Sequence, residues 1–179
     1  MIKKVYLIFV LLPFVFINSC VKPSQSYLEK SKQGNEIIKQ VEAMCTFNSL
    51  LDKSKDWNLA TIYFPTNSSS LSKTDKEILN KLETIYKKCT KNMLIIGHSS
   101  NLETKKDLTI ALNLSYKRTQ QVYNYLTSKK IPSSNLSVLF CSNNKNKVNE
   151  KTALDATFNQ RVDIIILNSP KEQHLYDCL

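Results

Sequence analysis

Apolar residues between positions 57 and 168 fall into two patterns, short continuous runs and stripes at helical spacing. The short runs predict strands, because a strand needs only four to eight residues and favours β-branched and aromatic side chains. The last run, RVDIIIL, predicts a central strand, since a strand buried on both faces does not alternate with polar residues. The predicted strands cover residues 59–64, 93–96, 137–140 and 161–167.

Two helical stripes lie between these runs. One begins at an approximate capping box of Ser72 and Asp75 and runs to residue 89. The other spans residues 108–126. We expect a long polar loop over residues 98–106, between the second strand and the second helix.

The elements follow the order strand, helix, strand, helix, strand, connection, strand, with room for a further helix in the Lys- and Asn-rich connection over residues 141–160. This order predicts an α/β (α+β) fold, a two-layer sandwich in which a mixed four-stranded sheet carries helices on one face. We place this domain at residues 58–168, which is a normal size for a single domain.

The first 19 residues have the layout of a secretory signal, because Lys3 and Lys4 precede an apolar run too short to favour a spanning helix. Residues 17–20, Ile-Asn-Ser-Cys, resemble the bacterial lipobox, whose cysteine becomes the first mature residue and is lipidated. The alternative is an ordinary signal peptide that happens to contain a cysteine, but no better cleavage site of small residues lies nearby. We therefore expect a lipid anchor at Cys20.

Several acyl chains would hold the mature chain on a membrane without a spanning helix. Val21 follows the cysteine, whereas in enteric bacteria it is chiefly aspartate at this place that retains a lipoprotein at the inner membrane. We therefore expect a lipid anchor in the outer membrane and a protein that faces the periplasm. Residues 20–57 are interpreted as a polar tether and a short amphipathic helix over 35–45, and residues 169–179 as a tail.

The formal net charge of +10 falls to +8 when the two signal lysines are removed. A basic balance indicates an anionic partner, most commonly nucleic acid. Export argues against nucleic acid and leaves the carboxylates of peptidoglycan and the phosphates of lipopolysaccharide, although a solvated lysine-rich surface explains most of the charge.

Four cysteines remain in the mature chain besides the lipidated one. In an oxidising compartment an even number favours two disulfides, and three connectivities are open, among them a nested one that joins the two flanking cysteines. A metal site is disfavoured because the chain has no C-x-x-C pair and its histidines, His98 and His174, lie far apart in the sequence. We expect no metal and no cofactor. The four cysteines are Cys45, Cys89, Cys141 and Cys178.

Five motifs occur in a recognisable order. They are IYFPTNSSSL at residues 62–71, GHSS at 97–100, L-S-x-x-R at 114–118 followed by Val122, Ile-Pro at 131–132, and NQRV at 159–162. Over residues 58–168 this order resembles the OmpA-like domain family, which includes the C-terminal domain of OmpA and the peptidoglycan-associated lipoprotein. The resemblance implies the OmpA-like βαβαβ(α)β fold and a module that binds the diaminopimelate residue of the peptidoglycan stem peptide.

Diaminopimelate presents an ammonium beside carboxylates, and the family binds it with the aspartate of G-H-T-D and the arginine of its L-S-x-x-R-A helix. Arg118 matches that arginine, whose planar fork can bind a carboxylate bidentately. Ser100 stands in place of the aspartate when counted from the loop glycine. Counted back from Leu114, the family spacing falls on Glu103, because the loop is three residues longer. We hypothesise that Glu103, or less readily Asp107, faces Arg118; the alternative is that both are solvated and half of the charge pair is lost.

The resemblance assigns three further residues to peptidoglycan binding, Ser115, Asn67 and Arg161. Asn67 could equally form a turn, and Arg161 a strand-end ion pair. Two family positions differ here, since Ala111 replaces an asparagine and Gln160 replaces the first arginine of N-R-R-V. These changes predict a less ordered pocket.

No catalytic constellation accompanies these residues. His98 precedes two serines, but a triad also needs an acid and a nucleophile placed by the fold, so we predict a structural hydrogen-bonding role for His98. The leading interpretation is a lipoprotein that ties the outer membrane or an envelope complex to peptidoglycan. The alternative is a docking subunit of an envelope machine, such as a secretion-system core complex, with weak or no peptidoglycan binding, and an enzyme comes third.

Overall fold

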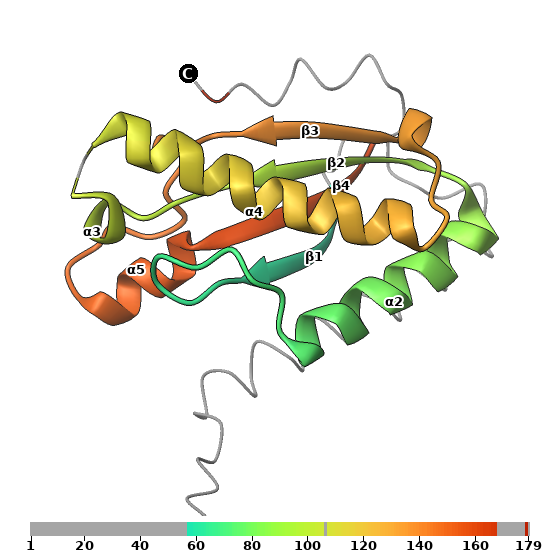
Figure 1. The fold of residues 1–179 in the computed structure, drawn as a ribbon, viewed down its shortest axis with the longest axis horizontal. Helices are drawn as coiled ribbons and strands as arrows, with labels where there is room; N and C mark the ends of the chain where they lie inside the picture. The colour runs from blue at the N-terminus through green and yellow to red at the C-terminus, as the bar shows by residue number, and fades with distance from the viewer. Residues whose placement is uncertain (1–56, 106, 168–177, 179) are drawn as a thin grey trace, which may run out of the picture.

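The computed structural model describes residues 57–105, 107–167 and 178 (Figure 1). Within these ranges the strands form one sheet in the order β1-β4-β2-β3. Strand β4 is antiparallel to both of its neighbours, whereas β2 and β3 run parallel. The mixed four-stranded sheet and the central place of its last strand are therefore confirmed. The strands are β1 (Trp57–Tyr63), β2 (Asn92–Gly97), β3 (Leu136–Phe140) and β4 (Arg161–Leu167).

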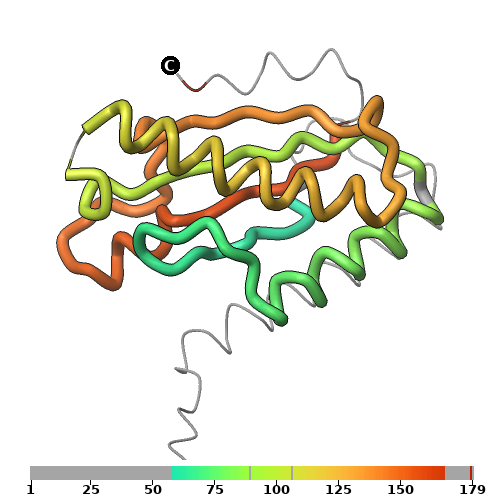
Figure 2. Tube along the Cα trace, viewed as in Figure 1, coloured from blue at the N-terminus to red at the C-terminus, as the bar shows by residue number. Residues whose placement is uncertain are grey.

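Helices α2 (Lys73–Cys89) and α4 (Leu108–Ser128) lie on the same face of the sheet (Figures 1 and 2). The predicted capping box starts α2, because the Ser72 hydroxyl accepts from the backbone N–H of Asp75 and the Asp75 carboxylate accepts from the backbone N–H of Ser72. Aliphatic side chains from both helices and alternate strand positions fill the core between the layers. They include Leu79, Leu82, Val122, Leu126, Ile62, Ile95 and Ile164.

Part of the second face of the sheet is apolar as well. Leu94 and Ile96 on β2, with Ile165 and Leu167 on β4, alternate with the core residues and are also buried. Burial on both faces explains why these strands have continuous apolar runs in the sequence.

A disulfide joins Cys141, directly after β3, to Cys178. The nested pairing of the two flanking cysteines is therefore wrong, since Cys178 has a different partner. Cys45, the tether and the predicted helix over 35–45 lie outside the described residues, and so does the side chain of Cys89.

Strands β1, β2 and β3 point the same way, so their C-terminal ends meet the start of β4 at one end of the sheet (Figure 1). We call this the loop end; its loops are residues 64–72, 98–105 and 141–152. Two short helices, α3 (Asn101–Thr104) and α5 (Ala153–Asn159), pack against each other there. The expected polar loop over 98–106 is therefore wrong in part, because it contains α3. The optional helix in the last connection is α5.

Gly97, the last residue of β2, allows α4 to pack directly on the sheet. A Cβ at this position would collide with Thr119 Oγ1 and with the carbonyl oxygen of Ser115. Positions 115 and 119 lie one turn apart on the same side of α4, so the contact fixes the rotation of the helix about its axis. Arg118 is thereby directed to the loop end.

Candidate functional site

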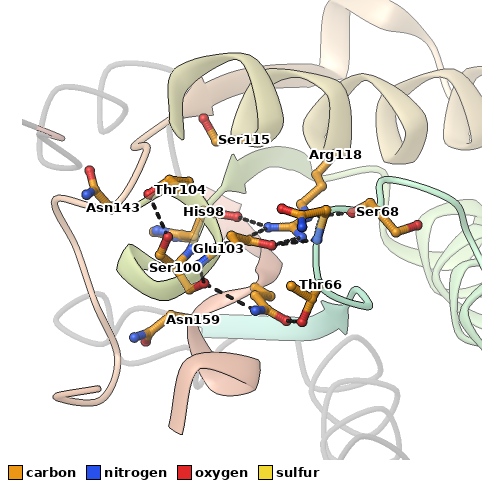
Figure 3. Close-up of polar contacts among 12 residues, drawn as sticks. Thr66, Ser68, His98, Ser100, Glu103, Thr104, Ser115, Arg118, Asn143 and Asn159 are labelled. Atoms are coloured by element: carbon orange, nitrogen blue, oxygen red, sulfur yellow. Dashed lines mark hydrogen bonds and ion pairs between the residues drawn. The ribbon is translucent and has the colours of Figure 1, made fainter. Parts of the chain in front are cut away.

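Arg118 and Glu103 form a buried ion pair at the loop end, and Figure 3 shows their side chains pointing toward each other. Nη1 of Arg118 lies 2.7 Å from Oε1 of Glu103, and Nη2 lies 2.9 Å from Oε2. Neither side chain has any exposed surface. The structure thus places Glu103 opposite Arg118. Asp107 instead caps α4, where it accepts from the backbone N–H groups of Thr109 and Ile110.

All five N–H groups of the Arg118 guanidinium are used. Besides the two bonds to the carboxylate, Nε donates to the carbonyl of Ser68 at 2.9 Å. Nη1 donates to the carbonyl of His98 at 3.1 Å, and Nη2 to that of Pro65 at 3.2 Å. The guanidinium carbon also lies 5.3 Å from the centroid of the Phe64 ring. A ligand carboxylate would therefore find no free N–H group on this arginine.

The Glu103 carboxylate is equally saturated. Its Oε1 also accepts from the backbone N–H of Ser100 at 2.8 Å, and its Oε2 from the backbone N–H of Asn67 at 2.9 Å. Asn67 has a left-handed backbone with φ of 57°, which asparagine tolerates better than most residues. Asn67 thus forms a turn whose backbone N–H donates to Glu103. This hydrogen bond links the β1–α2 turn to α3 and, through Arg118, to α4.

Ser100 is fully buried and caps the start of α3. Its hydroxyl accepts from the backbone N–H of Glu103 and from Nε2 of Gln160, both at 3.1 Å. Gln160, which replaces a family arginine, therefore ties α3 to the start of β4. Instead of the less ordered pocket that the altered residues predicted, the loop is held by a closed set of hydrogen bonds.

Two of the predicted site residues lie outside this network. Ser115 is buried and donates to the carbonyl of Leu112 within α4, and Figure 3 shows it apart from the ion pair. Arg161 lies on the sheet face away from the helices, where Nε donates to Oδ2 of Asp163 at 2.8 Å and Nη2 to the carbonyl of Lys145. Arg161 is therefore the strand-end ion pair that the sequence offered as its second interpretation.

Residues 63–160, more than half of the chain, match the model of the OmpA family. The chain belongs to the OmpA family. A search of curated proteins finds no match.

Solved structures share the fold of this OmpA-family domain. The peptidoglycan-associated lipoprotein from Burkholderia pseudomallei is 18% identical, with a TM-score of 0.56 over 66% of this chain and 98% of that one. The cell wall anchor of the T6SS from Pseudomonas aeruginosa is 21% identical, with a TM-score of 0.51 over 61% and 80%. A putative MotB-like protein from Desulfovibrio vulgaris is 12% identical, with a TM-score of 0.54 over 79% and 98%. At these identities the likeness establishes the fold.

Glu150 is a site residue that the sequence did not reveal. Its carboxylate accepts from the backbone N–H groups of Asn101 and Leu102, at 2.9 and 2.8 Å, and so caps the start of α3 from outside. It also accepts from the side-chain amides of Asn146 and Asn159. No local pattern could have indicated Glu150, because the N–H groups that it caps lie 48 and 49 residues away. Helix α3 itself has a local sequence signal, because Ser-x-x-Glu at residues 100–103 is a capping box.

His98 forms a second buried polar cluster with Asp163, on the sheet face away from the helices. Nε2 of His98 lies 3.4 Å from Oδ2 of Asp163, which also accepts from Arg161, while Oδ1 accepts from the hydroxyl of Thr61. Burial lowers the pKa of His98, against the opposing effect of Asp163. Burial alone would raise the pKa of Asp163, but hydrogen bonds from His98 and Thr61 and the Arg161 charge hold it well below its usual range.

In the described part of the chain, no helix is long and apolar enough to cross a membrane. No group of three or more His, Cys, Asp or Glu side chains there is placed to hold a metal ion.

Removing one partner of the ion pair should leave the other charge buried without compensation. We expect Arg118→Met and Glu103→Leu each to lower the free energy of unfolding by about 3–5 kcal/mol. The double variant should lose clearly less than the sum, because no charge then stays buried. Urea denaturation measures the three values. Asp107→Asn, at an exposed helix cap, is the control and should cost about 1 kcal/mol or less. Losses that simply add would contradict the coupling.

The buried His98 predicts a loss of stability in mild acid. Its folded pKa is lowered, so the unfolded chain binds the proton first, and stability is complete above about pH 6.5 and falls below it. Asp163 acts separately, below about pH 4, because its own pKa is lowered from the usual carboxyl range. The wild-type protein should have a lower free energy of unfolding at pH 5.5 than at pH 7.5. We expect this difference to be smaller in His98→Gln by about 1 kcal/mol. His174→Gln is the control, and a larger effect there than at position 98 would refute the assignment.

Proposed function

We propose that this OmpA-family protein is a non-catalytic, lipid-anchored module of the outer membrane that binds the stem peptide of peptidoglycan from the periplasmic side. The observation that supports it is the convergence of the β1–α2 turn, the loop after β2 and the middle of α4 around one buried ion pair. These are the segments in which the family motifs lie. Their junction gives the loop end a defined surface on which a peptide can bind.

In this proposal Arg118 positions the surface and does not touch the ligand. All of its N–H groups are bonded within the protein, and it has no exposed surface. A bidentate ligand contact would require the Glu103 carboxylate to leave, which would expose two backbone N–H groups that it now satisfies.

A second function, docking within an envelope assembly, is favoured by a separate observation. Among the described residues, all of the exposed large apolar side chains lie on α3, on the first half of α4, at the end of β3 or on α5. On α4, Leu108, Leu112 and Tyr116 follow one another at helical spacing. The Tyr116 ring packs edge-on against the Phe140 ring, with 5.7 Å between the two ring centroids. Apolar side chains gathered in this way are typical of a protein interface.

Sedimentation with purified sacculi tests peptidoglycan binding. We expect the full-length protein, in detergent, to sediment with sacculi, and Arg118→Ala to remain in the supernatant because α3 and the turn lose their junction. The Arg118→Met, Glu103→Leu double variant tests whether binding requires Arg118. If it is folded and still sediments, binding requires no contact from Arg118 to the ligand; if it is folded and does not, binding requires the ion pair or Arg118 itself. Failure of the wild-type protein to sediment would contradict the proposal and favour docking.

Lipidation at Cys20 is tested in cells. Globomycin, which blocks the signal peptidase of lipoproteins, should cause the precursor to accumulate, and Cys20→Ser should abolish labelling by radioactive palmitate. Cys89→Ser serves as the control and should keep the label. Normal processing in the presence of globomycin would show that residues 17–20 are not a lipobox.

A further inference from the structure

A cavity of about 560 Å³ lies beside the closed ion pair, between α3 and the segment that leads into α5. Its size is within the range of small-ligand sites. From its charges and its wall we infer that this cavity binds a carboxylate-bearing peptide with small apolar side chains. The inference rests on the proposed function, because the stem peptide of peptidoglycan is a ligand of this chemistry.

Helix α3 separates the ion pair from the cavity. Glu103 points from α3 into the protein and saturates Arg118, whereas Asn101, Leu102 and Lys105 line the cavity. The same short helix thus removes the arginine from solvent and forms the wall of an open site next to it. A ligand that approaches the loop end meets the cavity and not the arginine.

The cations that the cavity offers are Lys105 and Lys151. Both residues are exposed, and neither ammonium forms an ion pair with another residue in the described ranges. Asp155 lies near Lys151, and its Oδ2 accepts from the Thr152 hydroxyl and from the backbone N–H groups of Thr152 and Lys151. These hydrogen bonds, together with the Lys151 charge, lower the pKa of the Asp155 carboxyl. Two lysines in the lining of one cavity can each donate hydrogen bonds to a ligand carboxylate.

The acidic residue of the lining is hydrogen-bonded within the protein. Glu150 accepts hydrogen bonds from the backbone N–H groups of Asn101 and Leu102 and from the amides of Asn146 and Asn159. Its carboxylate is therefore used to hold the wall in place.

The remaining wall determines what the rest of the ligand is. Leu102, whose exposed fraction is 55%, and Ala153 provide apolar surface in the lining. Short alkyl side chains fit this surface, while the lysines select negative charge. A stem peptide, in which alanine alternates with residues that bear carboxylates, combines both features.

Binding of a soluble stem tripeptide, alanyl-glutamyl-diaminopimelate, to the full-length protein in detergent tests the inference by calorimetry, beside the sedimentation assay with sacculi. We expect Lys105→Gln with Lys151→Gln to weaken tripeptide binding by about tenfold or more, because charge-assisted hydrogen bonds are lost. Ala153→Trp keeps every charge but fills the cavity, and it should weaken binding similarly. The matched control is Lys73→Gln with Lys76→Gln on α2, which removes the same charge from exposed positions and should change affinity less than about twofold.

The outcomes distinguish the two proposals. If the wild-type protein binds and the cavity variants bind equally well, the cavity is not the site, whereas the proposed function stands. Equal weakening by both lysine pairs would also overturn the inference, since it would show attraction by net charge alone. If the wild-type protein binds neither tripeptide nor sacculi, the proposed function fails and the cavity site fails with it.

Discussion

The buried pair of Arg118 and Glu103 is the interaction on which the loop end depends. Burying two charges carries a desolvation cost that their attraction offsets only when the remaining polar atoms are also bonded. Here the five N–H groups of Arg118 and the two carboxylate oxygens of Glu103 are all hydrogen-bonded. Besides the two bonds between the side chains, Arg118 donates to three backbone carbonyls and Glu103 accepts from two backbone N–H groups. The pair therefore joins three separate segments of the chain, and its main effect is to specify how they meet.

Because the Arg118 guanidinium is fully bonded within the protein, a ligand carboxylate must be bound by other residues. An arginine fork recognises a carboxylate with fixed geometry, whereas a lysine ammonium is a mobile point charge. If the stem peptide binds beside Lys105 and Lys151, its recognition relies on charge more than on geometry, and added salt weakens such contacts between exposed charges. The site would hold its ligand less specifically than a bidentate arginine, and the apolar wall at Leu102 and Ala153 would have to supply part of the selectivity.

Much of the fold follows from sequence patterns, because strand and helix periods differ and the last strand, buried on both faces, has a continuous apolar run. The Glu103–Arg118 pairing was accessible from motif spacing, since both residues lie on neighbouring segments of one loop and helix. The sequence did not reveal that the N–H groups of Arg118 are all bonded within the protein, because two of their acceptors are the carbonyls of Pro65 and Ser68, some fifty residues earlier in the chain. Glu150 and the cavity were inaccessible for the same reason, since long-range contacts leave no local period.

The exposure of Leu108 and Leu112 on α4 follows from a mismatch in length. At 1.5 Å per residue, the 21 residues of α4 extend for about 31 Å, whereas the six residues of β2 span about 20 Å. Gly97 ends β2 against Ser115, so the turns of α4 before position 115 project beyond the sheet. Leu108 and Leu112 continue the helical stripe but have no strand to cover. The overhang gives α3 a wall to pack against, and it leaves apolar side chains exposed at the loop end. The same geometry thus supports a peptide site and a docking surface at the loop end.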